Sequence, residues 1–259
     1  MLFTDQLNRT IRLENFPPKR IVSLVPSQTE LLYDLDLENE VIGITKFCIH
    51  PTEWFKTKQR VGGTKTAKLD VIDDLKPDLI IANKEENEQW QIEALCEKYP
   101  VYISNIFNLN DALNMIQNVG KITNTSQKAN IIADRISLDF SQLKPLQQIK
   151  TCAYLIWKNP YMACGTDTFV NDMLQRVGLK NVFEGRYPEC TIEVLKEKNP
   201  EVILLSSEPF PFKENHITEL QQNLPNCKIV LVDGELFSWY GSRLLHAPNY
   251  FSQLKNLLQ

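Results

Sequence analysis

Two side chains near residue 50 are of the types that bind metal ions. Cys48 and His50 lie two residues apart and follow an apolar run at 41–44. A neutral imidazole is the commonest metal ligand in proteins, and a cysteine thiolate suits soft metals. The chain has three histidines, which do not cluster as in a zinc or manganese site. His50 is therefore a candidate metal ligand, and the alternative is a packing or surface histidine.

Aromatic residues form a second group that could contact a ligand. Several fall in or beside expected loops, namely Phe47, Trp157, Tyr187, Phe237, Trp239 and Tyr240, and Thr64 follows a glycine pair. Aromatic side chains of this kind can line a ligand site. We expect them at the carboxyl ends of strands, where crevices of α/β proteins open. Each aromatic taken alone can instead cover the core, and Trp90, on an expected helix, is assigned to packing or the surface.

Common catalytic motifs do not occur in the sequence. G-x-S-x-G, G-x-G-x-x-G, the P-loop and H-E-x-x-H are all absent. Adjacent carboxylates at Asp73–Asp74 and Glu85–Glu86 are typical of helix caps or an acidic surface. We predict that the chain is not an enzyme; substrate turnover that depends on His50 would argue for the alternative, an enzyme on an α/β scaffold.

The composition indicates a globular protein with a substantial core. Hydrophobic residues make up 43% of the 259 residues, and the net charge is -4. No basic run is present, which argues against a nucleic-acid partner. The amino terminus lacks the features of a secretory signal, and no stretch of about 18 apolar residues could span a membrane. Six scattered cysteines without a C-x-x-C pair suit reduced thiols, so we expect a cytoplasmic protein or an exported one whose signal is missing here.

The first 105 or so residues alternate short apolar runs with helical patterns. The expected strands are 20–24, 41–44, 79–82 and 101–103. Pro26 ends the first strand, and Ser27 to Glu30 have the S-x-x-E form of a capping box. Helical patterns also precede Pro77 and follow the third strand. Strands that alternate with helices at this spacing predict a parallel sheet.

Residues 109–146 have a different character. No strand-like run appears there, and Ile132, Ile136 and Phe140 recur at helical spacing. We predict one long helix that connects two lobes, because a helical segment of about 35 residues does not fit inside one α/β lobe. Alternation resumes beyond it, with strands expected at 152–157, 202–205 and 229–232 and helices at 168–177, 192–198 and 242–258.

The predicted fold is therefore α/β, with two Rossmann-like lobes that each contain a central, mainly parallel sheet. The expected division is an amino-terminal lobe at 1–108, the connecting helix at 109–146 and a carboxyl-terminal lobe at 147–259. A weak internal repeat supports it, since LKPDLII at 75–81 matches KNPEVIL at 198–204. A glutamate lies eight residues beyond each repeat's proline, at Glu85 and Glu208. The alternative is that helix–Pro–strand turns recur by chance.

The ordered motifs resemble those of a known family. They are RIVSLVPSQTELL at 20–32, VIGIT at 41–45, VGGT at 61–64, LKPDLIIA at 75–82 and YGSRLL at 240–245. Together they are similar to the helical-backbone substrate-binding proteins of ABC importers, and closest to the cobalamin-binding branch. The resemblance runs from about residue 20 to the carboxyl end and is specific for the family more than for the ligand.

This resemblance implies two lobes bridged by a long helix that limits hinge motion, with a metal chelate held between them. The chelate would be a corrinoid, haem or ferric siderophore, and the chain would hold no cofactor of its own. A glutamate on each lobe would bind arginines of the membrane permease. Glu85 or Glu86 and Glu208 match that pattern, although Glu88 and Glu214 are near enough to compete.

The expected ligand contacts combine the resemblance with the aromatic pattern. They are Phe47, His50, Thr64, Trp157, Tyr187, Trp239 and Tyr240. Tyr187 matches an aromatic of the family's cobalamin pocket, and His50 is the candidate axial ligand to cobalt or iron. The branch's tryptophan after the glycine pair is replaced by Thr64 or Lys65, which puts the ligand's identity in doubt.

Three hypotheses follow. The first is a monomeric substrate-binding component of an ABC importer, with a corrinoid-type chelate as its ligand. The second is a cytosolic relative that has lost transport and binds a cofactor, and the third is a haem or ferric-siderophore binder. The family implies a periplasmic or membrane-associated setting, whereas the missing signal and the cysteines favour the cytoplasm.

Overall fold

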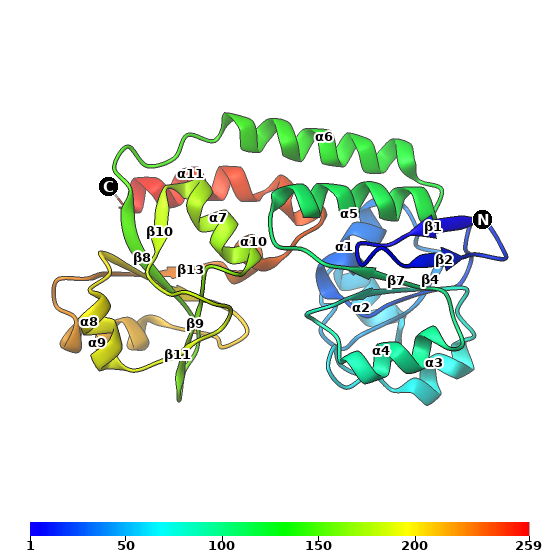
Figure 1. Ribbon diagram of the computed structural model, residues 1–259, viewed down its shortest axis with the longest axis horizontal. Coiled ribbons are helices and arrows are strands. Elements are labelled where there is room, and N and C mark those ends of the chain that lie inside the picture. Colours follow the sequence, from blue (N-terminus) through cyan, green and yellow to red (C-terminus); the bar gives the residue numbers. More distant parts are fainter. Residues whose placement is uncertain (259) are drawn as a thin grey trace. The chain divides into compact units, whose positions relative to one another are not determined.

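The computed structural model describes residues 1–258, which form two units (Figure 1). Unit 1 combines residues 1–106, 110–137 and 240–243, and unit 2 combines 107–109, 138–239 and the chain from 244 onward. Each unit has its own sheet with helices around it, and the chain therefore crosses from one unit to the other several times. Among residues 1–258 no helix is both long and apolar enough to cross a bilayer.

Unit 1 is built on a five-stranded parallel sheet in the order β5-β4-β3-β6-β7. Its strands are β3 (Ile21–Ser23), β4 (Val41–Ile44), β5 (Gln59–Arg60), β6 (Leu79–Asn83) and β7 (Val101–Ser104). The four strands predicted for this half are confirmed. Every residue of β3, β6 and β7 is buried, as expected for a parallel sheet covered on both faces.

The helices of unit 1 alternate with these strands. They are α1 (Pro26–Asp34), α2 (Thr52–Thr57), α3 (Leu69–Leu75), α4 (Gln89–Cys96) and α5 (Leu109–Ile122). The predicted capping box at α1 is wrong, because the cap is Val25, two residues before Ser27, and Pro26 lies in the first turn. Ser27 therefore lies inside the helix, and the Glu30 carboxylate instead pairs with Arg243 through contacts of 2.8 and 2.6 Å.

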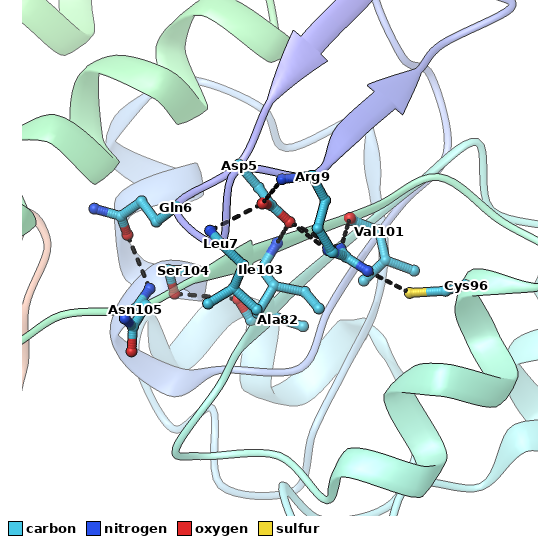
Figure 2. A network of polar contacts seen from close by, with 10 residues as sticks. All are labelled: Asp5, Gln6, Leu7, Arg9, Ala82, Cys96, Val101, Ile103, Ser104 and Asn105. Atoms are coloured by element: carbon cyan, nitrogen blue, oxygen red, sulfur yellow. Dashed lines mark hydrogen bonds and ion pairs between the residues drawn. The ribbon is translucent and has the colours of Figure 1, made fainter.

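An amino-terminal hairpin covers the exposed edge of β7. Strands β1 (Leu2–Thr4) and β2 (Thr10–Arg12) pair antiparallel, and the loop between them lies along β7 (Figure 2). The buried Asp5 carboxylate accepts hydrogen bonds from the amides of Leu7 and Arg9 at 2.9 Å, and the Arg9 guanidinium donates to the Val101 carbonyl at 2.8 Å. This loop satisfies backbone groups that an edge strand would otherwise expose to other chains.

The single long helix predicted over 109–146 is instead two helices, α5 and α6 (Ser126–Gln142). The break falls at Thr123–Asn124–Thr125. Asn124 has a left-handed φ of 62°, and the Thr123 hydroxyl donates to the Val119 carbonyl at 2.7 Å. Short polar side chains that bond to nearby backbone groups compete with helix continuation, which accounts for the break.

Unit 2 contains a mixed sheet in the order β11-β9-β8-β12-β13. Its strands are β8 (Lys150–Trp157), β9 (Tyr161–Cys164), β10 (Leu179–Asn181), β11 (Glu189–Cys190), β12 (Val202–Ser206) and β13 (Lys228–Val232). The three predicted strands, β8, β12 and β13, are confirmed and run parallel. The start of β8 also pairs with β10, while β9 runs antiparallel beside its later part.

The helices of unit 2 complete the alternation. They are α7 (Phe169–Val177), α8 (Ile192–Lys198), α9 (Glu214–Asn223), α10 (Gly234–Ser238), the 3-10 turn η1 (Ser242–Leu245) and α11 (Ala247–Leu258). The predicted helix at 242–258 is thus a 3-10 turn followed by α11. Phe237, one of the loop aromatics, is fully buried against Tyr154 and Phe251 and belongs to the core.

The internal repeat has a structural basis. Helices α3 and α8 end at Lys76 and Asn199, which have left-handed φ values of 46° and 43°. The acid two residues later bonds to the backbone at the start of the adjacent parallel strand in each unit. Asp78 accepts from the amides of Lys19 and Arg20 at 2.8 Å, and Glu201 accepts from the Thr151 amide at 2.8 Å.

We predict that Asp78→Ala lowers the free energy of unfolding by about 1–2 kcal/mol, because two backbone amides lose a charged acceptor. Urea denaturation measures the change. Asp74→Ala, at an exposed position on α3, is the matched control and should change stability by less than about 0.5 kcal/mol. Equal effects of the two substitutions would show that Asp78 does not anchor β3.

Candidate functional site

The carboxyl edge of the unit 1 sheet collects most of the site residues predicted in this half. Because all five strands run in one direction, the loops that follow them leave from one edge. Phe47 and His50 follow β4, Thr64 follows β5, and Glu85 and Glu86 follow β6. Phe47 is 50% exposed, whereas His50, Thr64 and the two glutamates are half-buried.

Two buried asparagines, which the sequence analysis did not identify, hold these loops together. The Asn87 side chain donates to the carbonyls of Leu24 at 3.2 Å and Thr64 at 3.0 Å, and accepts from the Asn83 amide at 2.9 Å. It therefore joins the segments that follow β3, β5 and β6. The Asn83 side chain accepts from the amides of Glu85 and Glu86 and donates to the Ser104 hydroxyl at 2.9 Å. The signal available in the sequence was two amides four residues apart at the end of a buried strand.

Cys48 does not fit the role of a metal ligand. Its thiol is fully buried and lies 3.1 Å from the hydroxyls of Thr29 and Thr45. Burial raises the pKa of this thiol, which disfavours the thiolate that a metal would need. Among residues 1–258 there is also no group of three or more His, Cys, Asp or Glu side chains placed to hold a metal ion. His50 remains a candidate only for a metal carried by a ligand.

Three of the predicted site residues lie at the carboxyl edge of the parallel strands in unit 2. Trp157 ends β8, Glu208 follows β12, and Trp239 follows β13 and α10. Trp157 is 41% exposed and packs edge-on against Phe210, with ring centroids 5.8 Å apart. Trp239 is buried, with 7% of its surface exposed. Tyr240 is also buried, at 6% exposed, and belongs to unit 1.

Glu208 holds the tryptophan that precedes the crossing between units. Its carboxylate accepts from the Trp239 indole N–H at 2.9 Å and from the Ser238 hydroxyl at 2.7 Å. Burial raises the pKa of Glu208, and the nearby acids Glu235 and Asp233 add to the shift, against the lowering by the two hydrogen bonds. The predicted role was a surface acid; the structure gives this carboxylate internal partners.

Tyr187 lies in the loop between β10 and β11 and is 38% exposed. The Arg186 guanidinium lies 5.9 Å from its ring centroid and 5.4 Å from that of Phe107. In unit 1, the ammonium of Lys65 approaches the Glu88 carboxylate at 3.6 Å and donates to the Glu85 carbonyl at 2.6 Å. Lys65 thus lies beside the acidic stretch that contains Glu85, Glu86 and Glu88.

The raised pKa of Glu208 predicts a distinct dependence of stability on pH. The folded protein takes up a proton here at a higher pH than the unfolded chain, whose glutamate has the ordinary value of 4.5. The cost of holding this charge therefore falls as the pH drops toward 4.5. Relative to Glu208→Gln, the native protein should gain melting temperature as the pH falls from 7 toward 4.5. Exposed Glu189→Gln is the control, and parallel curves for the native protein and Glu208→Gln would contradict the assignment.

Comparison with known proteins finds relatives in sequence and in fold. An uncharacterized ABC transporter substrate-binding lipoprotein of Bacillus subtilis is 27% identical over 215 residues, which is 77% of this chain and 67% of that protein. A vitamin B12-binding protein of Vibrio parahaemolyticus is 25% identical over 204 residues, covering 76% of this chain and 74% of the relative.

Solved structures share the fold at lower identity. The periplasmic vitamin B12-binding protein of Vibrio cholerae superposes with a TM-score of 0.78 at 21% identity, covering 94% of this chain and 98% of that one. A periplasmic haem-binding protein of Pseudomonas aeruginosa gives 0.76 at 18% identity, covering 93% and 92%. The family model described as periplasmic binding protein matches residues 21–225. The chain therefore belongs to the periplasmic binding protein family, whose members serve as substrate-binding components of ABC-type transport systems.

Proposed function

We propose that this protein binds a metal chelate of the corrinoid type and delivers it to an ABC permease. The observation that carries the ligand class is a set of partly exposed aromatics, namely Phe47 and Tyr187 in loops and Trp157 at the end of β8. No cluster among residues 1–258 suits a bare metal ion, so a metal would have to arrive within a larger ligand. A flat macrocycle with polar edges fits aromatic faces of this kind.

Relatives support this ligand class over others. Two of the comparisons are to proteins named for vitamin B12, one of them at 25% sequence identity. Haem is the second candidate, because a haem-binding protein has the same fold. The relative named as a lipoprotein supports an extracytoplasmic place of action. The cytosolic alternative gains no support from these comparisons.

Trp157 provides the test of the ligand site. Trp157→Ala should weaken cobalamin binding by about tenfold, equivalent to about 1.4 kcal/mol, through loss of an aromatic contact. Quenching of the remaining tryptophan fluorescence measures the affinity. Trp90→Ala is the matched control, since Trp90 is 61% exposed on α4, and it should leave the affinity unchanged. Equal affinities for the native protein and Trp157→Ala would remove Trp157 from the site.

The same titration, followed by visible absorption, tests His50. If its imidazole is an axial ligand, bound aquocobalamin should show a spectral shift that His50→Ala abolishes. A spectrum that His50→Ala leaves unchanged would assign His50 to the surface of the loop.

We further propose that Glu85 and Glu86 contact the permease. They are half-buried acids whose backbone is fixed by Asn83, so their position is well defined. Glu208 is the weaker candidate for the second contact, because its carboxylate already accepts hydrogen bonds from Ser238 and Trp239.

Replacing Glu85 and Glu86 together with alanine should leave ligand affinity unchanged and abolish uptake of labelled cobalamin into proteoliposomes that carry the partner permease. The Glu93/Glu97 double alanine variant, which removes two exposed acids of the α4 region, is the control. A loss of affinity would place Glu85 and Glu86 in the ligand site, and unchanged uptake would contradict their contact with the permease.

A further inference from the structure

Unit 2 carries a pocket that brings a cation and an anion together beside Tyr187. Its volume is about 500 Å³, and it is lined by Phe107, Thr166, Asp167, Thr168 and Arg186. Arg186 and Asp167 are both exposed residues. The pocket therefore offers guanidinium donors and carboxylate acceptors to one ligand group.

Aromatic rings hold the guanidinium of Arg186. Its central carbon lies 5.4 Å from the ring centroid of Phe107 and 5.9 Å from that of Tyr187. Attraction between the cation and the ring faces restrains a side chain that would otherwise sample many rotamers. A guanidinium is planar and presents its N–H donors at its edge, which lysine could not reproduce.

Backbone hydrogen bonds join the two loops that carry the charged residues. The Gly165 amide donates to the Arg186 carbonyl at 2.7 Å, and the Asp167 amide donates to the Gly185 carbonyl at 2.8 Å. A β-carbon at Gly165 would lie 2.4 Å from the Gly185 carbonyl oxygen, so only glycine permits this close approach. The two loops are thus joined at the backbone beside both charged residues, which line the same pocket.

Thr168, the residue after Asp167, has another role. The Thr168 hydroxyl donates to the Gly165 carbonyl at 2.8 Å and accepts from the Asn171 amide at 3.2 Å, which caps α7. Recognition of a polar ligand group in this pocket would therefore depend mainly on Arg186, Asp167 and Thr166.

A pocket that offers both a hydrogen-bond donor and an acceptor favours a ligand group that can itself accept and donate. A primary carboxamide accepts through its oxygen and donates through its nitrogen, so it can bond to Arg186 and Asp167 together. A carboxylate only accepts, and Asp167 would repel it. Resting on the proposed function, we infer that this pocket binds a peripheral carboxamide of the ligand. It thereby selects an amidated corrinoid over macrocycles that carry carboxylates, such as haem.

The test compares cobalamin with its monocarboxylic acid derivatives, in which one peripheral propionamide is hydrolysed. The native protein should bind cobalamin at least about tenfold more tightly than the derivative whose altered group enters the pocket. Asp167→Asn should reduce this preference by about tenfold, because the neutral amide no longer repels a carboxylate. Arg186→Gln should weaken both ligands, and the carboxylate more.

The ratio of two affinities separates recognition from a general loss of folding, which would weaken both ligands alike. Exposed Glu189→Gln, outside the pocket, is the control and should leave the ratio unchanged. A preference that survives Asp167→Asn unchanged would overturn the inference while leaving the proposed function intact. Tight binding of haem that depends on Arg186 and is insensitive to Asp167→Asn would also overturn it. Failure of the native protein to bind either cobalamin or haem would overturn the proposed function, and this inference with it.

Discussion

The candidate site of unit 1 depends on the hydrogen bonds made by the buried side chain of Asn87. Parallel strands end together at one edge, and the loops beyond them carry backbone groups that must be paired when they are buried. Asn87 pairs two carbonyls and one amide from three different segments. An aliphatic residue would leave all three unsatisfied, at a cost of about 1–3 kcal/mol for each buried group. The position of Thr64 is thus set by a residue 23 positions later in the chain.

Unit 2 meets the same requirement with a different chemistry. Its loops after β12 and β13 are joined by a carboxylate, that of Glu208, rather than by an amide. A neutral amide satisfies loops at any pH, whereas a buried acid makes the arrangement depend on its protonation. The two units therefore share an architecture, visible in the equivalent roles of Asp78 and Glu201, and differ in how their edges are held.

Local sequence patterns predicted the sheets well and the site only in part. The buried strands were predicted correctly because short apolar runs with β-branched residues, such as those of β6 and β12, favour strands over other secondary structure. The helix break at Asn124 was missed, since periodicity on both sides of it is helical and the turn chemistry of three polar residues is a weaker signal. The burial of Trp239 could not be predicted from the sequence, because it depends on a contact with Glu208, which is distant along the chain.

The pocket at Arg186 could not be predicted for a similar reason. Asp167 and Arg186 are 19 positions apart, and they line one pocket because Gly165 pairs with Arg186, and Asp167 with Gly185, across two loops. The sequence predicted aromatic residues in loops. It did not predict which charged side chains would lie beside them.

The decisive measurement is calorimetric titration of the native protein with cobalamin, haem and a ferric siderophore. We expect saturable binding of cobalamin with one site per chain and a dissociation constant of about a micromolar or tighter, with haem weaker. Absence of binding by every chelate at micromolar concentrations would contradict it, and a clear preference for haem would reassign the ligand.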